Sequence, residues 1–119
     1  MQSVCTVNQT VKYLGKKWML LIILELYKGE DYTRRFTEIK DQLPGITAKV
    51  LSARLKELEE EGLVEKHVDA GTVPVRSEYT LTASGLGLVH VIKDIKRWAL
   101  EWKIENRACG AQDCHDCVL

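Results

Sequence analysis

The stretch of residues 47–61 separates its charged side chains by sign along the chain. Its first part, 47–56, carries three basic residues and no acidic one, whereas residues 57–61 carry four glutamates and no basic residue. The N-terminal end of a helix also presents backbone amides with partial positive charge, which favours phosphate. A helix with this pattern is suited to enter the major groove of DNA by its leading end. The candidate contacts are Thr47, Lys49, Val50, Ser52, Ala53, Arg54 and Lys56.

The chemistry expected at these positions depends on the side chain. We expect the lysines to bind phosphates more than bases, and the methyl group of Ala53 suits contact with the methyl of thymine. Arg54 lies on the flank of the same helix. The alternative is that Lys49, Arg54 and Lys56 form an ordinary solvated face, and the elements around the helix decide between the two.

Further basic residues lie on both sides of this stretch. Arg34 and Arg35 precede the next helix upstream, where they could clamp the DNA backbone. The hairpin expected downstream carries Lys66, His67 and Arg76. A cation beside a hairpin tip can reach a phosphate or the minor groove. The alternative for each hairpin residue is an exposed charge that protects an edge strand from aggregation.

Thiols are the other groups with chemistry of their own, at Cys5, Cys109, Cys114 and Cys117. The last three are spaced C-x4-C-x2-C, and soft thiolates at such spacing suit zinc or an iron–sulfur cluster. His115 adjoins Cys114, so Cys5 or a residue of a partner subunit is the better fourth ligand for zinc. A thiol switch and an unstructured tail are the alternatives to a metal site.

The pattern of apolar residues indicates the elements that position these side chains. Helices are expected at residues 7–14, 17–28, 36–43, 47–61 and 83–105, and strands at 63–68 and 75–81. The two middle helices are separated by about four residues that include Gly45, which is typical of a helix-turn-helix. A β-hairpin follows at once. The predicted fold class is therefore mainly α with a small β-hairpin wing (α+β), a winged helix-turn-helix.

The last expected helix carries a stripe of apolar residues at helical spacing: Leu88, Val91, Ile92, Ile95, Trp98, Ala99 and Trp102. All of these except Val91 are candidate dimer-interface residues. The stripe is more apolar surface than a hairpin and short helices readily cover, so it predicts a homodimer interface. Packing within one chain is the alternative. Two-fold symmetry would place two recognition helices about one DNA turn, ~34 Å, apart on a palindromic site.

Length and composition narrow the class of protein. The chain has 119 residues, 17 basic and 17 acidic, and is expected to form one DNA-binding domain (residues 1–105) with a cysteine-rich tail (residues 106–119). Zero net charge argues against a nucleic-acid binder, but a groove contact needs only one basic face. The chain contains no apolar run of about 20 residues and no secretion signal. We therefore expect a cytoplasmic protein without a membrane segment.

A series of short motifs occurs in order along the chain: Cys5, Gly15-Lys16-Lys17-Trp18, Arg35-Phe36-Thr37-Glu38-Ile39, Gly45-Ile46-Thr47, Lys49, Leu51-Ser52, Arg54-Leu55-Lys56-Glu57-Leu58, Gly62-Leu63, Pro74, Glu78-Tyr79, Leu81-Thr82 and Gly85. Over about residues 5–98, this series resembles the HxlR-type winged-helix transcription regulators, distant relatives of the MarR type. The resemblance implies a homodimeric DNA-binding repressor or activator that dimerises through its first and last helices. It also implies a redox-sensing thiol at Cys5, although Thr6 stands where the family commonly has proline. The cysteine-rich tail departs from the family.

Together these features predict a homodimeric regulator that binds a specific double-stranded DNA sequence and responds to thiol oxidation or metal. A winged-helix protein–protein interaction module without DNA binding is the alternative. A thiol-based enzyme is disfavoured, because the chain has no helix-opening C-x-x-C, no Ser/His/Asp set and no glycine-rich phosphate loop.

Overall fold

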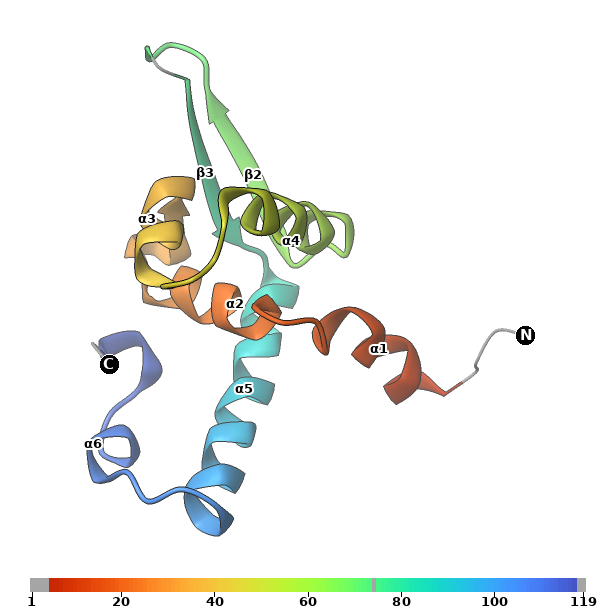
Figure 1. Cartoon of the computed structure of the whole chain (residues 1–119), viewed down its shortest axis with the longest axis vertical. Helices are drawn as coiled ribbons and strands as arrows, with labels where there is room; N and C mark the ends of the chain where they lie inside the picture. Colours follow the sequence, from red (N-terminus) through yellow and green to blue (C-terminus); the bar gives the residue numbers. More distant parts are fainter. Residues whose placement is uncertain (1–4, 74, 118–119) are drawn as a thin grey trace.

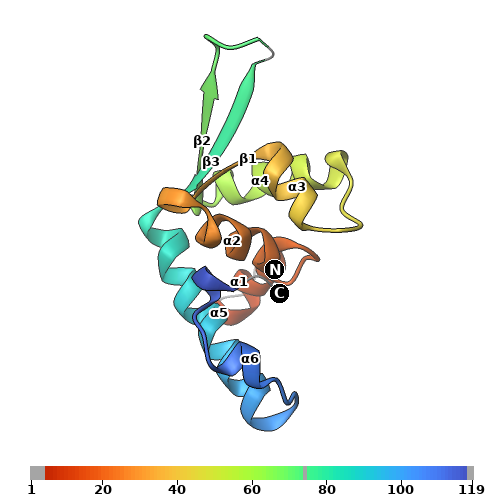
Figure 2. The same cartoon turned by 90° about the vertical axis from the view of Figure 1, so that its left-hand side faces the viewer.

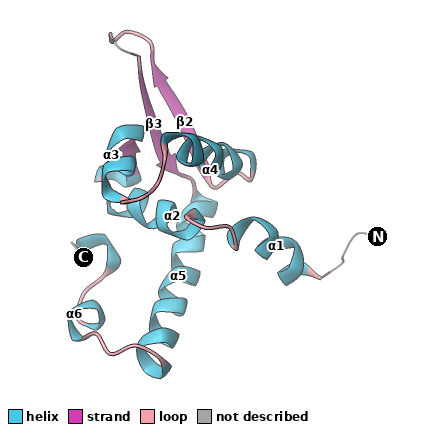
Figure 3. Ribbon diagram, in the orientation of Figure 1, coloured by secondary structure: helices cyan, strands magenta, loops and turns pink. Residues whose placement is uncertain are grey.

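The computed structural model describes residues 5–73 and 75–117, and Pro74, expected in the hairpin turn, lies outside them. Along the chain they form α1 (Thr6–Leu14), α2 (Met19–Lys28), the 3-10 helix η1 (Glu30–Tyr32), β1 (Thr33–Arg35), α3 (Phe36–Gln42), α4 (Ala48–Glu60), β2 (Val64–Asp69), β3 (Arg76–Leu81), α5 (Ala83–Trp102), α6 (Arg107–Gly110) and the 3-10 helix η2 (Cys114–Asp116). The described chain is mainly helical with a small antiparallel sheet (Figure 3), which confirms the predicted fold class.

Helix α2 is the centre of the hydrophobic core. It is apolar on most sides, and its residues Met19, Ile22, Ile23 and Leu26 are fully buried. It packs against α3, α4, α5 and the sheet. The helix begins at Met19, two residues later than expected, because Trp18 takes a left-handed backbone conformation with φ 82° that a helix cannot contain.

The helix-turn-helix is formed by α3 and α4, as expected. Between them Gly45 has φ +93°, a conformation that side chains with a Cβ rarely adopt. Thr47 then caps α4, because its hydroxyl accepts a hydrogen bond from the amide of Val50 at 3.1 Å. The inner face of α4 is buried through Leu51, Leu55 and Leu58. These contacts hold α4 on the core and leave its opposite face outward.

The sheet has the strand order β1-β3-β2, with both pairs antiparallel. Strands β2 and β3 form the expected hairpin, which projects from the helical body as a wing (Figures 1 and 2). Strand β1 was not expected, because it consists of three polar residues without an alternating pattern. It forms because Thr33, Arg34 and Arg35 pair with the base of β3.

Helix α5 is capped by the residue before it and ends sooner than expected. The hydroxyl of Thr82 accepts from the amide of Gly85 at 3.2 Å, and the helix ends at Trp102 rather than at residue 105. The chain then turns back along α5 through α6 and η2 and returns to α2 (Figure 1). Within residues 5–73 and 75–117, no helix is both long and apolar enough to span a membrane.

Candidate nucleic-acid interface

The leading half of α4 is open to solvent. Four of its predicted contact residues are exposed, namely Lys49, Ser52, Ala53 and Lys56. Val50 is half-buried beside the core, and the cap residue Thr47 is exposed. The two lysines therefore project from the helix with their charge accessible, and Lys49 lies in the first turn, where the α4 backbone amides point outward. This surface can accept a polyanion without rearrangement of the core.

Arg54 differs from the two lysines because its guanidinium pairs with Glu57 on the same helix. The Glu57 carboxylate also binds the Lys16 ammonium at 2.9 Å, and Lys16 follows α1. Arg54 and Glu57 are both about three-quarters buried as side chains. Arg54 thus belongs to a network that ties α4 to the loop after α1. The i,i+3 spacing of Arg54 and Glu57 could have indicated their pairing, but Lys16 lies 41 residues away and gave no signal.

The trailing half of α4 carries the acidic residues and lies near the base of the wing. Glu59, Glu60 and Glu61 are exposed. Burial raises the pKa of Tyr79 on β3, and the nearby Glu59 carboxylate raises it further. The separation of charge along α4 therefore persists in the folded chain, with the acidic end away from the leading lysines.

Arg35 and Arg76 are brought to one hollow between the start of α3 and the wing. The hollow has a volume of about 480 Å³ and is lined by Arg35, Phe36, Thr37, Val75, Arg76 and Ser77. Both arginine side chains are exposed. Arg35 also lies 3.8 Å from the carboxylate of Glu78. Two residues that lie 41 positions apart in the sequence thus present their charge together beside α3.

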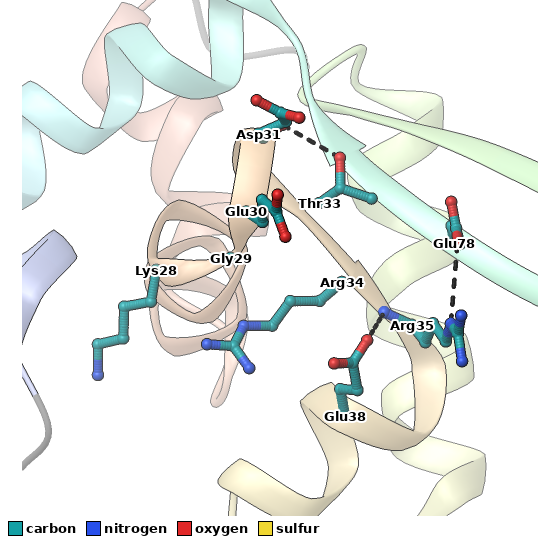
Figure 4. A pocket seen from close by; sticks show the side chains of 9 residues that line it. All are labelled: Lys28, Gly29, Glu30, Asp31, Thr33, Arg34, Arg35, Glu38 and Glu78. Carbon is teal, nitrogen blue, oxygen red and sulfur yellow. Dashed lines mark hydrogen bonds and ion pairs between the residues drawn. The ribbon is translucent and has the colours of Figure 1, made fainter.

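Arg34 points the other way, although it is adjacent to Arg35. Its Nε donates to the backbone carbonyl of Glu25 at 2.7 Å, and its side chain extends toward the end of α2 beside Lys28 (Figure 4). This follows from strand geometry, because successive side chains of a strand point to opposite faces. Arg34 therefore stabilises the junction of α2 and β1, and the expected backbone clamp is left to Arg35.

The wing residue Lys66 is exposed and lies with its ammonium 6.0 Å from the ring centre of Tyr79. Neighbouring His67 is also exposed, with its Nε2 3.7 Å from the carboxylate of Glu65. Lys66 is accessible near the wing base, whereas Arg76 lies farther along the hairpin, opposite Asp69.

The apolar stripe of α5 is partly core and partly surface. Ile92 is only 6% exposed and packs in the core of its own chain, which corrects the expectation that it contributes to a dimer interface. Leu88 is half-buried against the same core, and its role in an interface stays a prediction. Ile95, Trp98 and Trp102 are about half or more exposed, and Ala99 is half-buried. Val91, which belongs to the apolar stripe seen in the sequence, is also exposed. The open stripe is therefore Val91, Ile95, Trp98 and Trp102.

The cysteines lie at two separate places. Cys5 is exposed and caps α1, with its sulfur accepting from the amide of Asn8 at 3.4 Å. Cys109, Cys114 and Cys117 are half-buried in the returning tail. Within residues 5–73 and 75–117, no three His, Cys, Asp or Glu side chains are grouped so that they could hold a metal ion. A zinc or iron–sulfur site at the tail cysteines stays a prediction, which metal analysis of the purified protein can test.

Comparisons with known proteins agree with this geometry. A model of HxlR-like helix-turn-helix proteins matches residues 13–107. The chain belongs to the HxlR-like helix-turn-helix family. The HTH-type transcriptional regulator YvaP of Bacillus subtilis is 45% identical over 95 residues, which are 80% of this chain and 84% of YvaP. The HxlR-like fold is thus shared over most of both chains.

Solved structures of similar regulators have the same architecture. A transcriptional regulator assigned to the MarR family from Porphyromonas gingivalis W83 is 32% identical with a TM-score of 0.74, and the match covers 86% of this chain and 96% of that one. The reduced form of the regulator YodB from B. subtilis is 36% identical with a TM-score of 0.72, over 87% of this chain and 99% of YodB. YodB has also been solved after diamide treatment and with quinone bound. This HxlR-like protein is a DNA-binding transcriptional regulator, and that interpretation is favoured over a protein–protein interaction module.

Proposed function

We propose that this HxlR-like regulator is a homodimer that binds a palindromic DNA operator, with the leading half of α4 from each subunit in a major groove. The observation that carries the proposal is the exposure of Lys49, Ser52, Ala53 and Lys56 on one face of a capped helix. The mechanism is binding without catalysis, and a protein that acts on chromosomal DNA is placed in the cytoplasm.

The homodimer is supported by the open stripe of α5. Trp98 is 54% and Trp102 is 68% exposed on a helix whose other side packs on the core. Large aromatic side chains left in solvent on one helix face are typical of an interface. Helix α1 adds exposed Val7 and Val11. A palindrome requires a two-fold axis that places both copies of α4 on the same side of the dimer.

The contacts divide into positioning and specificity. Lys49 and Lys56 would displace counterions from phosphates, and the outward residues Ser52 and Ala53 would lie against base edges. Arg35 and Arg76, which line the hollow beside α3, would bind the flanking backbone on the side of the wing. This division predicts that α4 determines the sequence bound and that the arginines add affinity for any duplex.

Selection of bound duplexes from a random pool tests the proposal. We expect an inverted repeat whose half-sites are centred about one helical turn apart, bound by two chains per duplex in sedimentation experiments. A single unrepeated site with one chain per duplex would contradict the homodimer, and recovery of no preferred sequence would contradict specific binding.

A thiol response is a second proposal, and Cys5 is the residue that supports it. Cys5 is exposed, and its sulfur accepts a hydrogen bond from the backbone N–H of Asn8 at the start of α1, so an oxidant in solution can reach it. YodB, the relative solved in reduced, diamide-treated and quinone-bound forms, is a precedent for thiol-reactive ligands in this family.

Cys5→Ser tests this response without loss of the helix cap, because serine is a good N-cap residue. We expect diamide to lower DNA binding by the wild-type protein and to leave Cys5→Ser unchanged. Cys109→Ser is the matched control and should still respond. An equal diamide effect in the wild-type and Cys5→Ser proteins would contradict a role for Cys5.

A further inference from the structure

Residues 106–117, which we name the strap, contact both α2 and α5. Figure 2 shows the strap running beside α5, with η2 ending against α2. Helix α2 supports α3 and α4, whereas α5 carries the open stripe of apolar residues. The family model ends at residue 107, so nearly the whole strap lies outside the part shared with the family.

Asp113 of the strap contacts both helices at once. Its carboxylate accepts a hydrogen bond from the hydroxyl of Tyr27 on α2 at 2.9 Å. The same carboxylate forms an ion pair with the ammonium of Lys93 on α5 at 2.5 Å. Lys93 also donates to the Tyr27 hydroxyl at 2.8 Å and lies 4.9 Å from the centre of its ring. Side chains from α2, α5 and the strap therefore contact one another in all three pairs.

The ion pair in this cluster stays charged at ordinary pH. Hydrogen bonds from Lys93 and from the backbone amide of His115 lower the pKa of Asp113 to about 2. The hydrogen bond to Asp113, together with that to Tyr27, raises the pKa of Lys93 above its usual range. Small changes in pH near neutrality therefore leave both members of the pair charged.

Contacts on both sides extend this connection along the strap. The imidazole of His115 lies edge-on to Tyr27, with ring centres 5.6 Å apart, and edge-on to Tyr32 at 6.3 Å. The rings of Tyr27 and Tyr32 are themselves stacked. On the other side, Lys96 of α5 donates to the backbone carbonyl of Gln112 at 2.8 Å.

The strap and the open stripe occupy opposite sides of α5. At about 100° per residue, Lys93 and Lys96 lie on one side of the helix and the stripe of Val91, Ile95, Trp98 and Trp102 on the other. A partner subunit seated on the stripe therefore leaves the strap in place. The orientation of α4 relative to the two-fold axis then depends on the angle between α2 and α5, which the strap bridges.

We infer that the strap fixes the angle between α2 and α5 and thereby sets the spacing of the two DNA half-sites that the dimer accepts. Asp113 is the positioning residue: it does not contact DNA and acts through Tyr27 and Lys93. This inference rests on the proposed function, because spacing has a meaning only for a dimer on a repeated site. One base pair changes the separation of half-sites by about 3.4 Å and their relative rotation by about 35°, so a change in this angle that moves α4 by a comparable distance would alter the preferred spacing.

The test compares duplexes that differ only in spacing. The probes are the palindrome selected by the wild-type protein, the same palindrome with one base pair inserted or removed at its centre, and an unrelated duplex of equal length. For Asp113→Asn we expect affinity for the selected palindrome to fall about tenfold, with discrimination among the three spacings reduced and affinity for the unrelated duplex unchanged. A role limited to stability would not move the discrimination among spacings of the folded protein.

Glu105→Gln is the matched control, because it removes one negative charge from an exposed position just before the strap and leaves Tyr27, Lys93 and His115 untouched. It should discriminate as the wild-type protein does. Tyr27→Phe keeps the Lys93–Asp113 pair, so it should reduce discrimination among the three spacings by less than Asp113→Asn does. If Asp113→Asn fails to fold, Tyr27→Phe still tests the proposal. Wild-type discrimination retained in the folded variants would overturn the strap proposal alone, whereas a wild-type protein with no preferred spacing would overturn the palindromic operator as well.

Discussion

At the scale of single residues, the availability of a charge matters more than its presence in the sequence. Lys49, Arg54 and Lys56 lie within eight residues of α4, yet only the two lysines are exposed, whereas Arg54 pairs with Glu57. Likewise Arg35 is exposed while Arg34 binds the end of α2. The side chain that already has an internal partner gains less from a phosphate, because it must exchange one contact for another.

We predict that Lys49→Ala and Lys56→Ala each weaken binding to all duplexes. Each loses one phosphate contact, so the slope of log affinity against log salt should fall by about one unit. Fluorescence titrations at several salt concentrations measure both quantities. The control is Arg107→Ala, which removes an exposed basic side chain from α6, a helix far from α4 in Figure 1. This variant should change neither the affinity nor the salt slope. Unchanged affinity and slope in both lysine variants would remove these residues from the interface.

The lowered pKa of Asp113 allows a prediction of how the thermal stability of the protein changes in acid. The pKa of this carboxylate is lowered in the folded state from the usual 3.8 to about 2, so its contribution is fully present above pH 3.8 and is lost as the pH falls through about 2. We expect the difference in melting temperature between the wild-type protein and Asp113→Asn to be constant from pH 5 to 7 and to shrink between about pH 4 and 2. Thermal unfolding at each pH measures it, and a difference that did not shrink in acid would contradict the assignment.

At the scale of elements, local signals were sufficient for some parts of the fold and insufficient for others. Helix α4 was predicted within a residue at each end, because its cap at Thr47 and its buried leucines are all encoded in one stretch. Strand β1 was missed, because its partner is the distant β3. The strap was missed for the same reason, since Asp113 lies 86 residues from Tyr27.

The same distinction holds for the candidate site. The exposed face of α4 could be predicted from helical periodicity alone. The internal contacts of Arg34 and Arg54 could not be predicted in this way. Arg34 binds the carbonyl of Glu25 on another element, and the Glu57 partner of Arg54 is also bound by the distant Lys16. Ile92 was assigned to the surface stripe because periodicity does not show where the core ends on a helix that is apolar on two sides.

The junction of α5 with the wing supplies a prediction at this scale. A Cβ at Gly85 would lie 2.3 Å from the carbonyl oxygen of Leu63, so Gly85→Ala must push α5 away from the start of β2. We expect a loss of about 1–3 kcal/mol in the free energy of unfolding. Gly87→Ala in the same helix, where a Cβ meets nothing within 4 Å, should instead gain about 0.5–1 kcal/mol. Chemical denaturation measures both, and equal effects of the two substitutions would contradict the close approach.

At the scale of the whole molecule, the surface proposed to bind DNA and the surface proposed to bind a second subunit are distinct. Helix α4 and the wing lie at one end in Figure 1, and the open stripe follows α5 toward the other end. Affinity for a repeated site depends on both surfaces, because two linked α4 helices bind far more tightly than one. Disruption of the stripe is therefore expected to weaken DNA binding without a change in α4.

Ile95→Glu places a charge in the middle of the stripe, where burial against a partner would leave it without a counter-ion. We predict a monomer in sedimentation experiments and a loss of about a hundredfold or more in affinity for a palindrome. Arg97→Glu, on the opposite side of the same helix and exposed, is the control and should remain dimeric. An Ile95→Glu protein that still sedimented as a dimer would exclude this stripe as the interface.

The placement of the strap and the stripe on opposite sides of α5 has an evolutionary consequence. Neither side shares a residue with the other, so mutations in the tail accumulate without disturbing how subunits associate. If the strap sets the spacing of half-sites as proposed, changes within residues 106–117 would be enough to give access to promoters with differently separated repeats. Diversification of target genes in such a lineage requires neither a new base-contacting helix nor a new subunit contact.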